Sequence, residues 1–129
     1  MPPTEVYFYQ EEDGRVPVLE WMADLRRSNP KAFTKCDARI ESLEAMGHEL
    51  RRPLADYLRD GIYELRAGFQ GINYRILYFF HGRGIAIVAH ALTKEDRIPE
   101  KDLTIAFQRK AAVERNPERH IRGWEGEHD

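Results

Sequence analysis

Cysteine is nearly absent from this sequence, and its scarcity excludes the structural roles that cysteine usually has. The 129 residues include a single cysteine, Cys36, which cannot form an internal disulfide. The five histidines are scattered at positions 48, 81, 90, 120 and 128, without the spacing of a zinc site. We therefore expect a fold that needs no disulfide or structural metal, and an activity without a cofactor.

Several catalytic and membrane motifs are also missing. The segment Gly82-Arg83-Gly84 lacks the spacing of a phosphate-binding glycine loop, and there is no Gly-x-Ser-x-Gly sequence. Cys36 falls on the apolar stripe of an expected helix, which favours a core position over a nucleophile. No apolar run reaches about 18 residues, and no signal-peptide pattern is present, so we expect a soluble, cytoplasmic protein without a membrane partner.

An overall excess of positive charge is missing as well. Lys plus Arg number 20 against 22 Asp plus Glu, and the net charge is -2. Any nucleic-acid site must therefore be a local patch. Between positions 51 and 94 cations outnumber acids: the cations are Arg51, Arg52, Arg59, Arg66, Arg75, Arg83 and Lys94, and the acids are Asp56, Asp60 and Glu64.

What the sequence does contain is a set of strand patterns in residues 61–94. Runs at 62–66, 72–80 and 85–92 are rich in Ile, Val, Tyr and Phe, and glycine-bearing breaks separate them. Short glycine-containing breaks are typical of hairpins, so the three runs predict an antiparallel meander. A short aromatic run at residues 6–9 predicts one more strand at the edge of this meander.

Helical patterns flank these strands. Apolar residues recur at helical spacing from Pro17 to position 27, and a second helix is predicted from Pro30, capped by Asn29, to the residue before Gly47. These two helices predict a hairpin, and a third helix is predicted at residues 101–114. The polar residues 48–60 predict a connecting loop. The expected core includes Trp21, Leu25, Phe33, Ile40, Leu43, Ile76 and Ile87.

Together these elements predict one α+β domain over residues 1–115. A mixed, largely antiparallel sheet of about four strands would pack on the N-terminal helical hairpin, and a C-terminal helix would follow. Residues 116–129 are polar and lack periodicity, so they predict a tail in which disorder is expected.

Polar residues gather at the ends of the predicted strands. Arg66 precedes the turn at residues 67–71 and Arg75 follows it, which places two guanidiniums near one rim of the sheet. Arg75 interrupts an otherwise apolar strand, where a simple solvated role explains it poorly. His90 and Lys94 close the last strand.

These segments, taken in order, resemble the RelE/ParE toxin superfamily, and most closely its phage-derived HigB-like branch. The resemblance rests on Pro53-Leu54, on DGIYELR ending at Arg66, on YRILYF around Arg75, and on HALTK ending at Lys94 with Pro99 after it. It covers most of residues 6–113, including the order strand, two helices, three strands, helix. The lysine pair of the family is here Lys94-Glu95, and the chain is slightly acidic where many relatives are strongly basic.

The resemblance implies a RelE-like fold and the toxin of a type II toxin-antitoxin system. Such a toxin is a metal-independent endoribonuclease that cuts mRNA on the ribosome and thereby inhibits translation and growth. The implied partners are the ribosome-bound mRNA and a cognate antitoxin, expected to be a helix-turn-helix protein. The toxin would contact DNA only indirectly, through this antitoxin.

Under this hypothesis, Arg75 and Arg66 stabilise the scissile phosphate, because a guanidinium binds phosphate oxygens with two parallel donors. Lys94 would orient the RNA or protonate the leaving group. His90 and Tyr78 are both candidates for the base or acid, and the sequence does not choose between them. The expected substrate-binding cations are Arg51, Arg52, Arg59 and Arg97.

Structural roles compete with these assignments. Arg66 can pair with Glu64 or Asp60, His90 can be a hydrogen-bonded core residue, and Tyr78 can be a core aromatic. Two other functions also stay open. One is a ParE-like toxin that binds DNA gyrase without nuclease chemistry, and the other is a degenerate protein that binds an antitoxin and has no activity.

Overall fold

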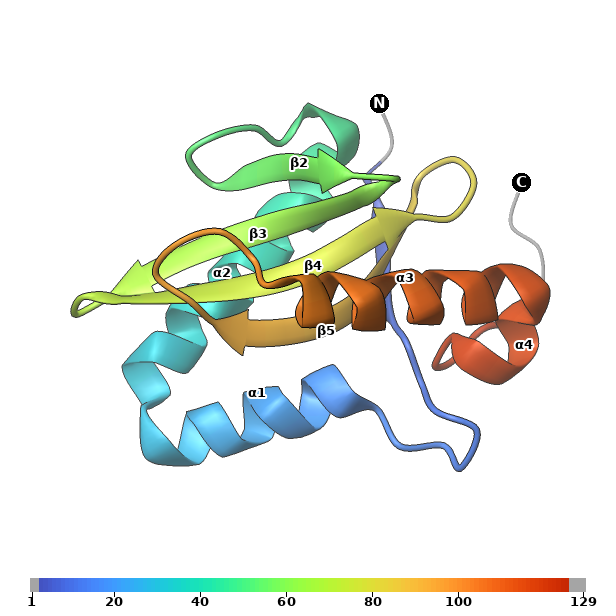
Figure 1. Ribbon diagram of the computed structural model, residues 1–129, viewed down its shortest axis with the longest axis horizontal. Coiled ribbons are helices and arrows are strands. Elements are labelled where there is room, and N and C mark those ends of the chain that lie inside the picture. Colours follow the sequence, from blue (N-terminus) through green and yellow to red (C-terminus); the bar gives the residue numbers. More distant parts are fainter. Residues whose placement is uncertain (1–2, 126–129) are drawn as a thin grey trace.

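A computed structural model describes residues 3–125 of the chain. The elements follow one another along the chain as shown in Figure 1. In order they are β1 (Glu5–Phe8), α1 (Pro17–Ser28), α2 (Pro30–Met46), the 3-10 turn η1 (Gly47–Glu49), β2 (Ala55–Arg59), β3 (Ile62–Phe69), β4 (Ile72–Phe80), β5 (Ile85–Thr93), α3 (Glu100–Arg115) and α4 (Pro117–His120).

Within residues 3–125 the strands form one 5-stranded sheet in the order β1-β5-β4-β3-β2. β1 runs parallel to β5, and all the other pairs are antiparallel. The predicted meander is confirmed as β3, β4 and β5, and the first strand lies at the predicted edge. The α+β class with its mixed, largely antiparallel sheet is thus confirmed, with one strand more than the sequence predicts.

The additional strand is β2, which lies inside the stretch predicted to be a loop. Only Ala55 of this strand is buried, and its other residues are partly or fully exposed, because β2 forms the far edge of the sheet. An exposed edge strand needs few apolar residues, so the polar sequence concealed it. The ring of Tyr57 packs edge-on against Tyr63 of β3, with their centroids 4.9 Å apart.

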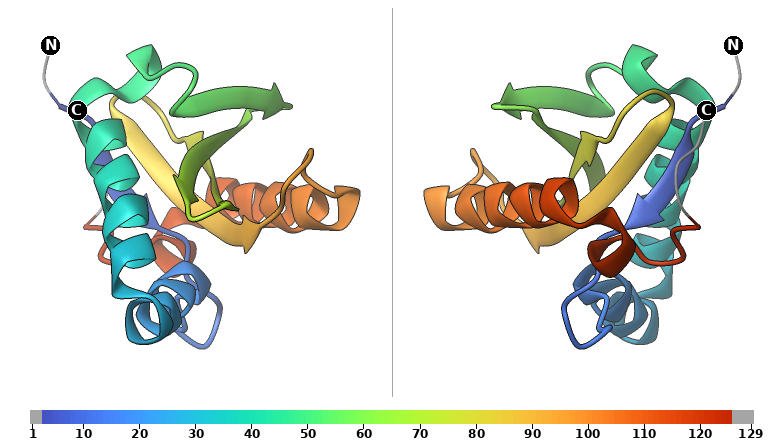
Figure 2. Two further views of the ribbon diagram at one scale, coloured as in Figure 1. Left: turned by 90° about the vertical axis from the view of Figure 1, so that its left-hand side faces the viewer. Right: turned by 90° about the vertical axis from the view of Figure 1, so that its right-hand side faces the viewer.

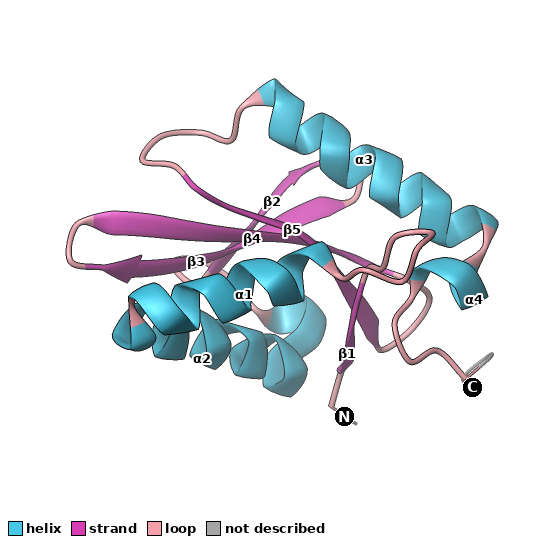
Figure 3. Ribbon diagram, turned by 90° about the horizontal axis from the view of Figure 1, so that it is seen from below, coloured by secondary structure: helices cyan, strands magenta, loops and turns pink. Residues whose placement is uncertain are grey.

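The helices cover the two faces of the sheet unequally (Figure 2). The hairpin of α1 and α2 packs on one face, against side chains such as Leu65, Ile76 and Val88. Helix α3 crosses the other face and packs on Leu77, with Phe79 and Ile87 in the same core. Figure 3 shows the hairpin and α3 on opposite sides of the strands. On the α3 side, Ile62 and Glu64 of β3 are buried, whereas Arg66 of β3 and Asp56 and Leu58 of β2 are only partly covered.

Four of the predicted core residues are buried, namely Ile40, Leu43, Ile76 and Ile87. Trp21, Leu25 and Phe33 are only partly buried at the margin of the same core. Each of them packs on the core beneath α1 and α2 with only part of its side chain, and Trp21 meets the ring of Tyr74 edge-on. Each helix within residues 3–125 is too short or too polar to span a lipid bilayer.

The segment that follows α3 differs from the expected tail. Residues 117–120 form α4, and Asn116 caps this helix by accepting a hydrogen bond from the backbone N–H of Arg119. Ile121 is buried and bridges to Tyr9, whose ring stacks on His120. Contacts with residues near the N-terminus, rather than helical periodicity, hold this segment in place. The predicted tail residues 126–129 lie outside the described part of the chain.

The packing of α2 on the sheet predicts a graded stability effect. Leu43 is fully buried, so Leu43→Ala should lower the free energy of unfolding by about 2 to 5 kcal/mol. Leu25→Ala should cost less, because Leu25 is partly exposed. Met46, at 46% exposure, is the control, and Met46→Ala should change stability by less than about 0.5 kcal/mol. Urea denaturation gives all three values, and equal losses for Leu43 and Met46 would contradict this packing.

Candidate functional site

Two arginines face each other across neighbouring strands on the partly covered side of the sheet. Arg66 of β3 is the register partner of Arg75 of β4, and both lie on the side that α3 occupies. Like charges directly opposite one another on an antiparallel pair repel. A negative charge between the guanidiniums would offset this repulsion.

Glu64 of β3 supplies that charge. Its side chain is 1% exposed, and both of its oxygens accept hydrogen bonds from arginine. Oε1 lies 2.7 Å from Arg75 Nη1, and Oε2 lies 2.8 Å from both Nε and Nη2 of Arg66. One carboxylate oxygen thus binds Arg75, and the second oxygen binds Arg66. We call these three residues the Glu64 cluster.

The two arginines of the Glu64 cluster differ in exposure. The Arg75 side chain is 9% exposed, and its Nη2 donates to the backbone oxygen of Glu95 at 3.3 Å. The Arg66 side chain is 38% exposed, and within residues 3–125 its Nη1 has no hydrogen bond. Its backbone carbonyl accepts a bond of 2.9 Å from Arg39 Nε of α2. Arg75 is therefore an interior group, whereas Arg66 presents one edge of its guanidinium to solvent.

The Glu64 cluster continues outward through Asp56 of β2. Asp56 Oδ2 lies 3.7 Å from Arg66 Nη2 and 2.7 Å from Arg52 Nη2. The hydrogen bond from Arg52 is the main cause that keeps the pKa of the Asp56 carboxyl below its usual value. Positive and negative side chains thus alternate from Arg52 to Arg75 along this surface.

A second group of cations lies on the loop before α3 and at the end of β2. Arg59, Lys94 and Arg97 line a cleft of about 720 Å³ next to the start of α3. Arg59 holds Glu100 with two hydrogen bonds of 2.6 and 2.8 Å, and its guanidinium lies 5.3 Å from the ring centre of Phe107. Lys94 and Arg97 form no ion pair with any residue of the described part of the chain.

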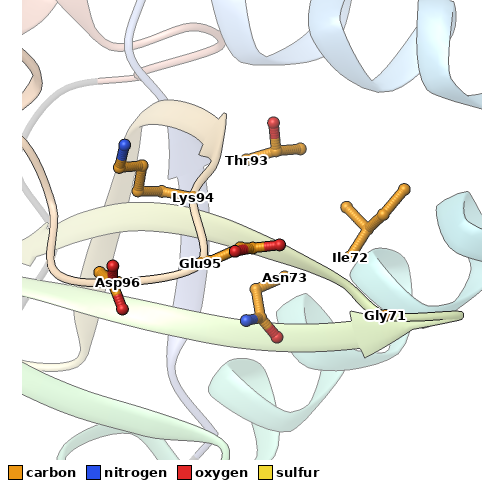
Figure 4. Close-up of a pocket in the computed structure, with 7 residues that line it drawn as sticks. All are labelled: Gly71, Ile72, Asn73, Thr93, Lys94, Glu95 and Asp96. Atoms are coloured by element: carbon orange, nitrogen blue, oxygen red, sulfur yellow. The ribbon is translucent and has the colours of Figure 1, made fainter.

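Lys94 also lines a neighbouring hollow between the tip of the β3–β4 hairpin and its own loop. The side chain of Glu95 extends toward Ile72 and Asn73, whereas those of Lys94 and Asp96 point to the other side of the loop (Figure 4). The backbone N–H of Lys94 donates to the carbonyl of Asn73 at 3.1 Å, which ties the loop to β4. Lys94 therefore lies between this hollow and the cleft at the start of α3. It directly precedes Glu95, whose backbone oxygen accepts the hydrogen bond from Arg75.

His90 is engaged on both ring nitrogens. Nε2 lies 2.7 Å from Oδ1 of Asp102 in the first turn of α3, and Nδ1 lies 3.5 Å from Nη1 of Arg109. Arg109 also donates to the carbonyl of Ala89 at 2.7 Å. The arrangement fastens α3 to β5, so His90 has the contacts of a hydrogen-bonded core residue. Asp102 had no visible role in the sequence, because its partner lies in another element.

Tyr78 and Arg51 are not brought to this surface. Tyr78 is 1% exposed and faces the α1–α2 side, where its ring stacks on Tyr63 at 5.3 Å. Burial is the main cause that raises the pKa of the Tyr78 hydroxyl. Arg51 donates to the carbonyl of His48 in η1 at 2.6 Å. The sheet therefore separates Tyr78 from the Glu64 cluster.

The structure thus assembles one group from the predicted site residues. Arg52, Arg66 and Arg75 are joined through carboxylates, and Lys94, Arg59 and Arg97 lie beside them around the cleft. Sequence reasoning treated Glu64 only as an arginine partner. Strand alternation indicates that Glu64 and Arg66 share one face of β3. The pairing of β3 with β4 then places Arg75 directly opposite Arg66. Within residues 3–125, no three His, Cys, Asp or Glu side chains are grouped to hold a metal ion.

Cys36 gives a chemical test of this description. It is 0% exposed beneath the sheet, and burial raises the pKa of its thiol to about 11. Because the thiolate is the reactive form, the native protein should react with Ellman's reagent far more slowly at pH 8 than the urea-unfolded protein. Equally fast reaction of the native and unfolded chains would contradict the buried position.

One family of known proteins matches this chain. The model for "Phage derived protein Gp49-like (DUF891)" matches residues 23–111, a range that includes every residue of the Glu64 cluster and of the cleft. A search among curated proteins gives no match to the chain.

Proposed function

Since the chain belongs to the phage-derived Gp49-like family, we propose that it is the toxin of a type II toxin-antitoxin system and that it cleaves mRNA on the ribosome. The proposal is supported by the ordered motifs that resemble the HigB-like branch of the RelE/ParE superfamily. It is supported too by the observed α+β fold, in which a strand, the helical hairpin, the β3–β5 meander and a helix follow in the order that this resemblance implies, with β2 and α4 in addition.

The observation that carries the proposal is the placement of the solvent-facing cations. Arg66 and Lys94 lie on either side of the buried Arg75, which contacts Glu64 next to Arg66 and the carbonyl of Glu95 next to Lys94. Arg97 extends this row of cations, as do Arg52 and Arg59, each of which is paired with a carboxylate. A track of cations on an exposed surface is what a single-stranded RNA backbone requires.

The chemistry follows from these groups. In metal-independent RNA cleavage the 2'-hydroxyl gives up its proton, here to solvent, and forms a bond to the adjacent phosphorus. Charge grows on the phosphate oxygens, and the bond to the 5'-oxygen breaks as that oxygen takes up a proton. The open edge of Arg66 would stabilise the growing charge, and the ammonium of Lys94 would orient the RNA or donate a proton to the leaving oxygen. His90 would take part only after breaking its bond to Asp102, so the arrangement favours electrostatic stabilisation over acid–base catalysis by histidine.

This assignment predicts the effect of removing the Arg66 side chain. Loss of a preorganised contact to the transition state typically costs about a hundred- to a thousandfold in rate, so Arg66→Ala should lower mRNA cleavage on translating ribosomes by that factor. Arg15→Ala is the matched control, because Arg15 is exposed, pairs with Glu20 and lies near the start of α1. Cleavage at the wild-type rate by a folded Arg66→Ala protein would remove Arg66 from the site.

A second candidate function is gyrase binding of the ParE kind. The observation that favours it is that neither His90 nor Tyr78 is freely available as the base or acid, since His90 is bonded to Asp102 and Tyr78 is buried on the other face. A supercoiling assay with purified gyrase separates the two functions. Inhibition of supercoiling without ribosome-dependent cleavage would replace the nuclease proposal with this one.

The proposed toxin also requires a cognate antitoxin, which we expect to be a helix-turn-helix protein. An acidic segment of that protein would cover Arg66 and Lys94 and thereby compete with RNA for the same cations. Opposite charges would then attract the inhibitor and the substrate to one surface.

The shared surface gives a separate prediction. Arg66→Glu should weaken antitoxin binding, measured by calorimetry, and RNA binding together, because a new negative charge repels both acidic partners. Arg15→Glu, remote from the cleft, should leave both affinities near the wild-type values. An unchanged antitoxin affinity for Arg66→Glu would show that the antitoxin binds elsewhere.

A further inference from the structure

We infer that Glu64 and Arg75 form a positioning pair, which fixes the Arg66 guanidinium and the Lys94 loop, and that neither residue contacts RNA. The catalytic meaning of this inference rests on the proposed function. It differs from the expectation from sequence, in which the Arg75 guanidinium itself binds the scissile phosphate.

The contacts of Arg75 argue against a direct role. Its Nη1 is held by the Glu64 carboxylate at 2.7 Å, its Nη2 reaches the Glu95 carbonyl, and the side chain is 9% exposed. To reach a phosphate, Arg75 would have to leave Glu64, whose own side chain is 1% exposed. Glu64 would keep Arg66, but its buried Oε1 would lose its hydrogen-bond donor, which is costly, so this movement is unfavourable.

The contacts of Arg66 show what the pair holds in place. Glu64 fixes one edge of the guanidinium through Nε and Nη2, which directs Nη1 toward solvent. Arg39 fixes the backbone of the same residue from the α2 side. A flexible arginine normally loses side-chain freedom on binding, and one that is already fixed avoids most of that loss.

The same pair reaches Lys94 through the backbone. Arg75 bonds the carbonyl of Glu95, and the N–H of Lys94 bonds Asn73, so the chain is fastened on both sides of the Lys94 carbonyl. Both fastening points originate from β4. The buried Glu64–Arg75 pair thus sets the position of Arg66 on β3 and helps to set the position of Lys94 on the loop.

The test uses Glu64→Gln, which keeps the side-chain shape and removes the charge that anchors both arginines. Glu20→Gln is the matched control, because Glu20 also binds an arginine through both oxygens and is far from the cleft. With the full-length protein on mRNA-programmed ribosomes, Glu64→Gln should lower kcat by about ten- to a hundredfold with little change in KM, since it disturbs orientation rather than overall attraction.

A double-mutant cycle separates positioning from direct contact. If Glu64 acts through Arg66, then Arg66→Ala should cost much less in the Glu64→Gln background than in the wild-type protein. An equal cost in both backgrounds would overturn the inference. Glu64→Asp, which keeps the charge on a shorter side chain, should recover part of kcat.

A measurement that needs no activity keeps the inference distinct from the proposed function. The Nε–H signal of Arg66 in nitrogen-15 NMR should exchange slowly with water in the wild-type protein, and about tenfold faster or more in Glu64→Gln. An unchanged exchange rate would overturn the inference. A wild-type protein that shows this protection but cleaves no mRNA would instead refute the proposed function alone.

If Glu64→Gln does not fold, a second variant replaces it. The pair Glu64→Leu with Arg75→Met removes both charges at once, and apolar replacement of a whole buried ion pair is often tolerated. In this variant the Arg66 signal should lose its protection just as in Glu64→Gln. Retained protection would show that Glu64 does not position Arg66.

Discussion

The structure depends on one buried carboxylate between two opposed arginines. The register of β3 and β4 places Arg66 and Arg75 directly opposite each other. The Glu64 carboxylate binds both guanidiniums and offsets their repulsion. Breaking one partner of a buried ion pair typically costs about 3 to 5 kcal/mol. A slip of one residue would turn Arg75 to the opposite face and leave Glu64 paired with Arg66 alone, so the register and the candidate site are fixed by the same interaction.

This constraint explains how a chain with a net charge of -2 can hold a row of cations on one side of the sheet. Glu64 and Asp56 lie between the cations and hold them in place. Glu95, Asp96 and Glu100 line the neighbouring hollows. Lys94 and Arg97, on the loop, have no such carboxylate partner within residues 3–125. Local placement of charge, rather than the total, therefore determines where an RNA backbone would be attracted.

The sequence predicts those parts of the fold that local patterns govern. Alternation and glycine breaks locate β3, β4 and β5, and helical periodicity with Pro17 and Pro30 locates α1 and α2. It misses β2, because an edge strand has little apolar pattern. It also misses α4, which depends on contacts between Ile121 and Tyr9 that are distant in the chain.

The site is less predictable, because it depends on register and on contacts between distant elements. Parity indicates that Arg66 and Glu64 share a face, but only the pairing of β3 with β4 brings Arg75 to Glu64. A bulge opposite Leu77 and Tyr78 adds a residue to β5 and turns His90 toward α3. There His90 contacts Asp102, which lies 12 positions later in the chain. The sequence alone does not exclude Tyr78 from the site, because strand periodicity does not show which face of β4 packs on the α1–α2 hairpin.

The most direct test of this account is a structure of the protein on a ribosome with mRNA whose 2'-hydroxyl at the cleavage site is methylated, which prevents cleavage. We expect a phosphate oxygen within hydrogen-bonding distance of Arg66 Nη1 and of Lys94 Nζ, with Arg75 still bound to Glu64. A structure in which Arg75 has left Glu64 and binds the phosphate would contradict the account, as would a complex in which this surface faces away from the mRNA.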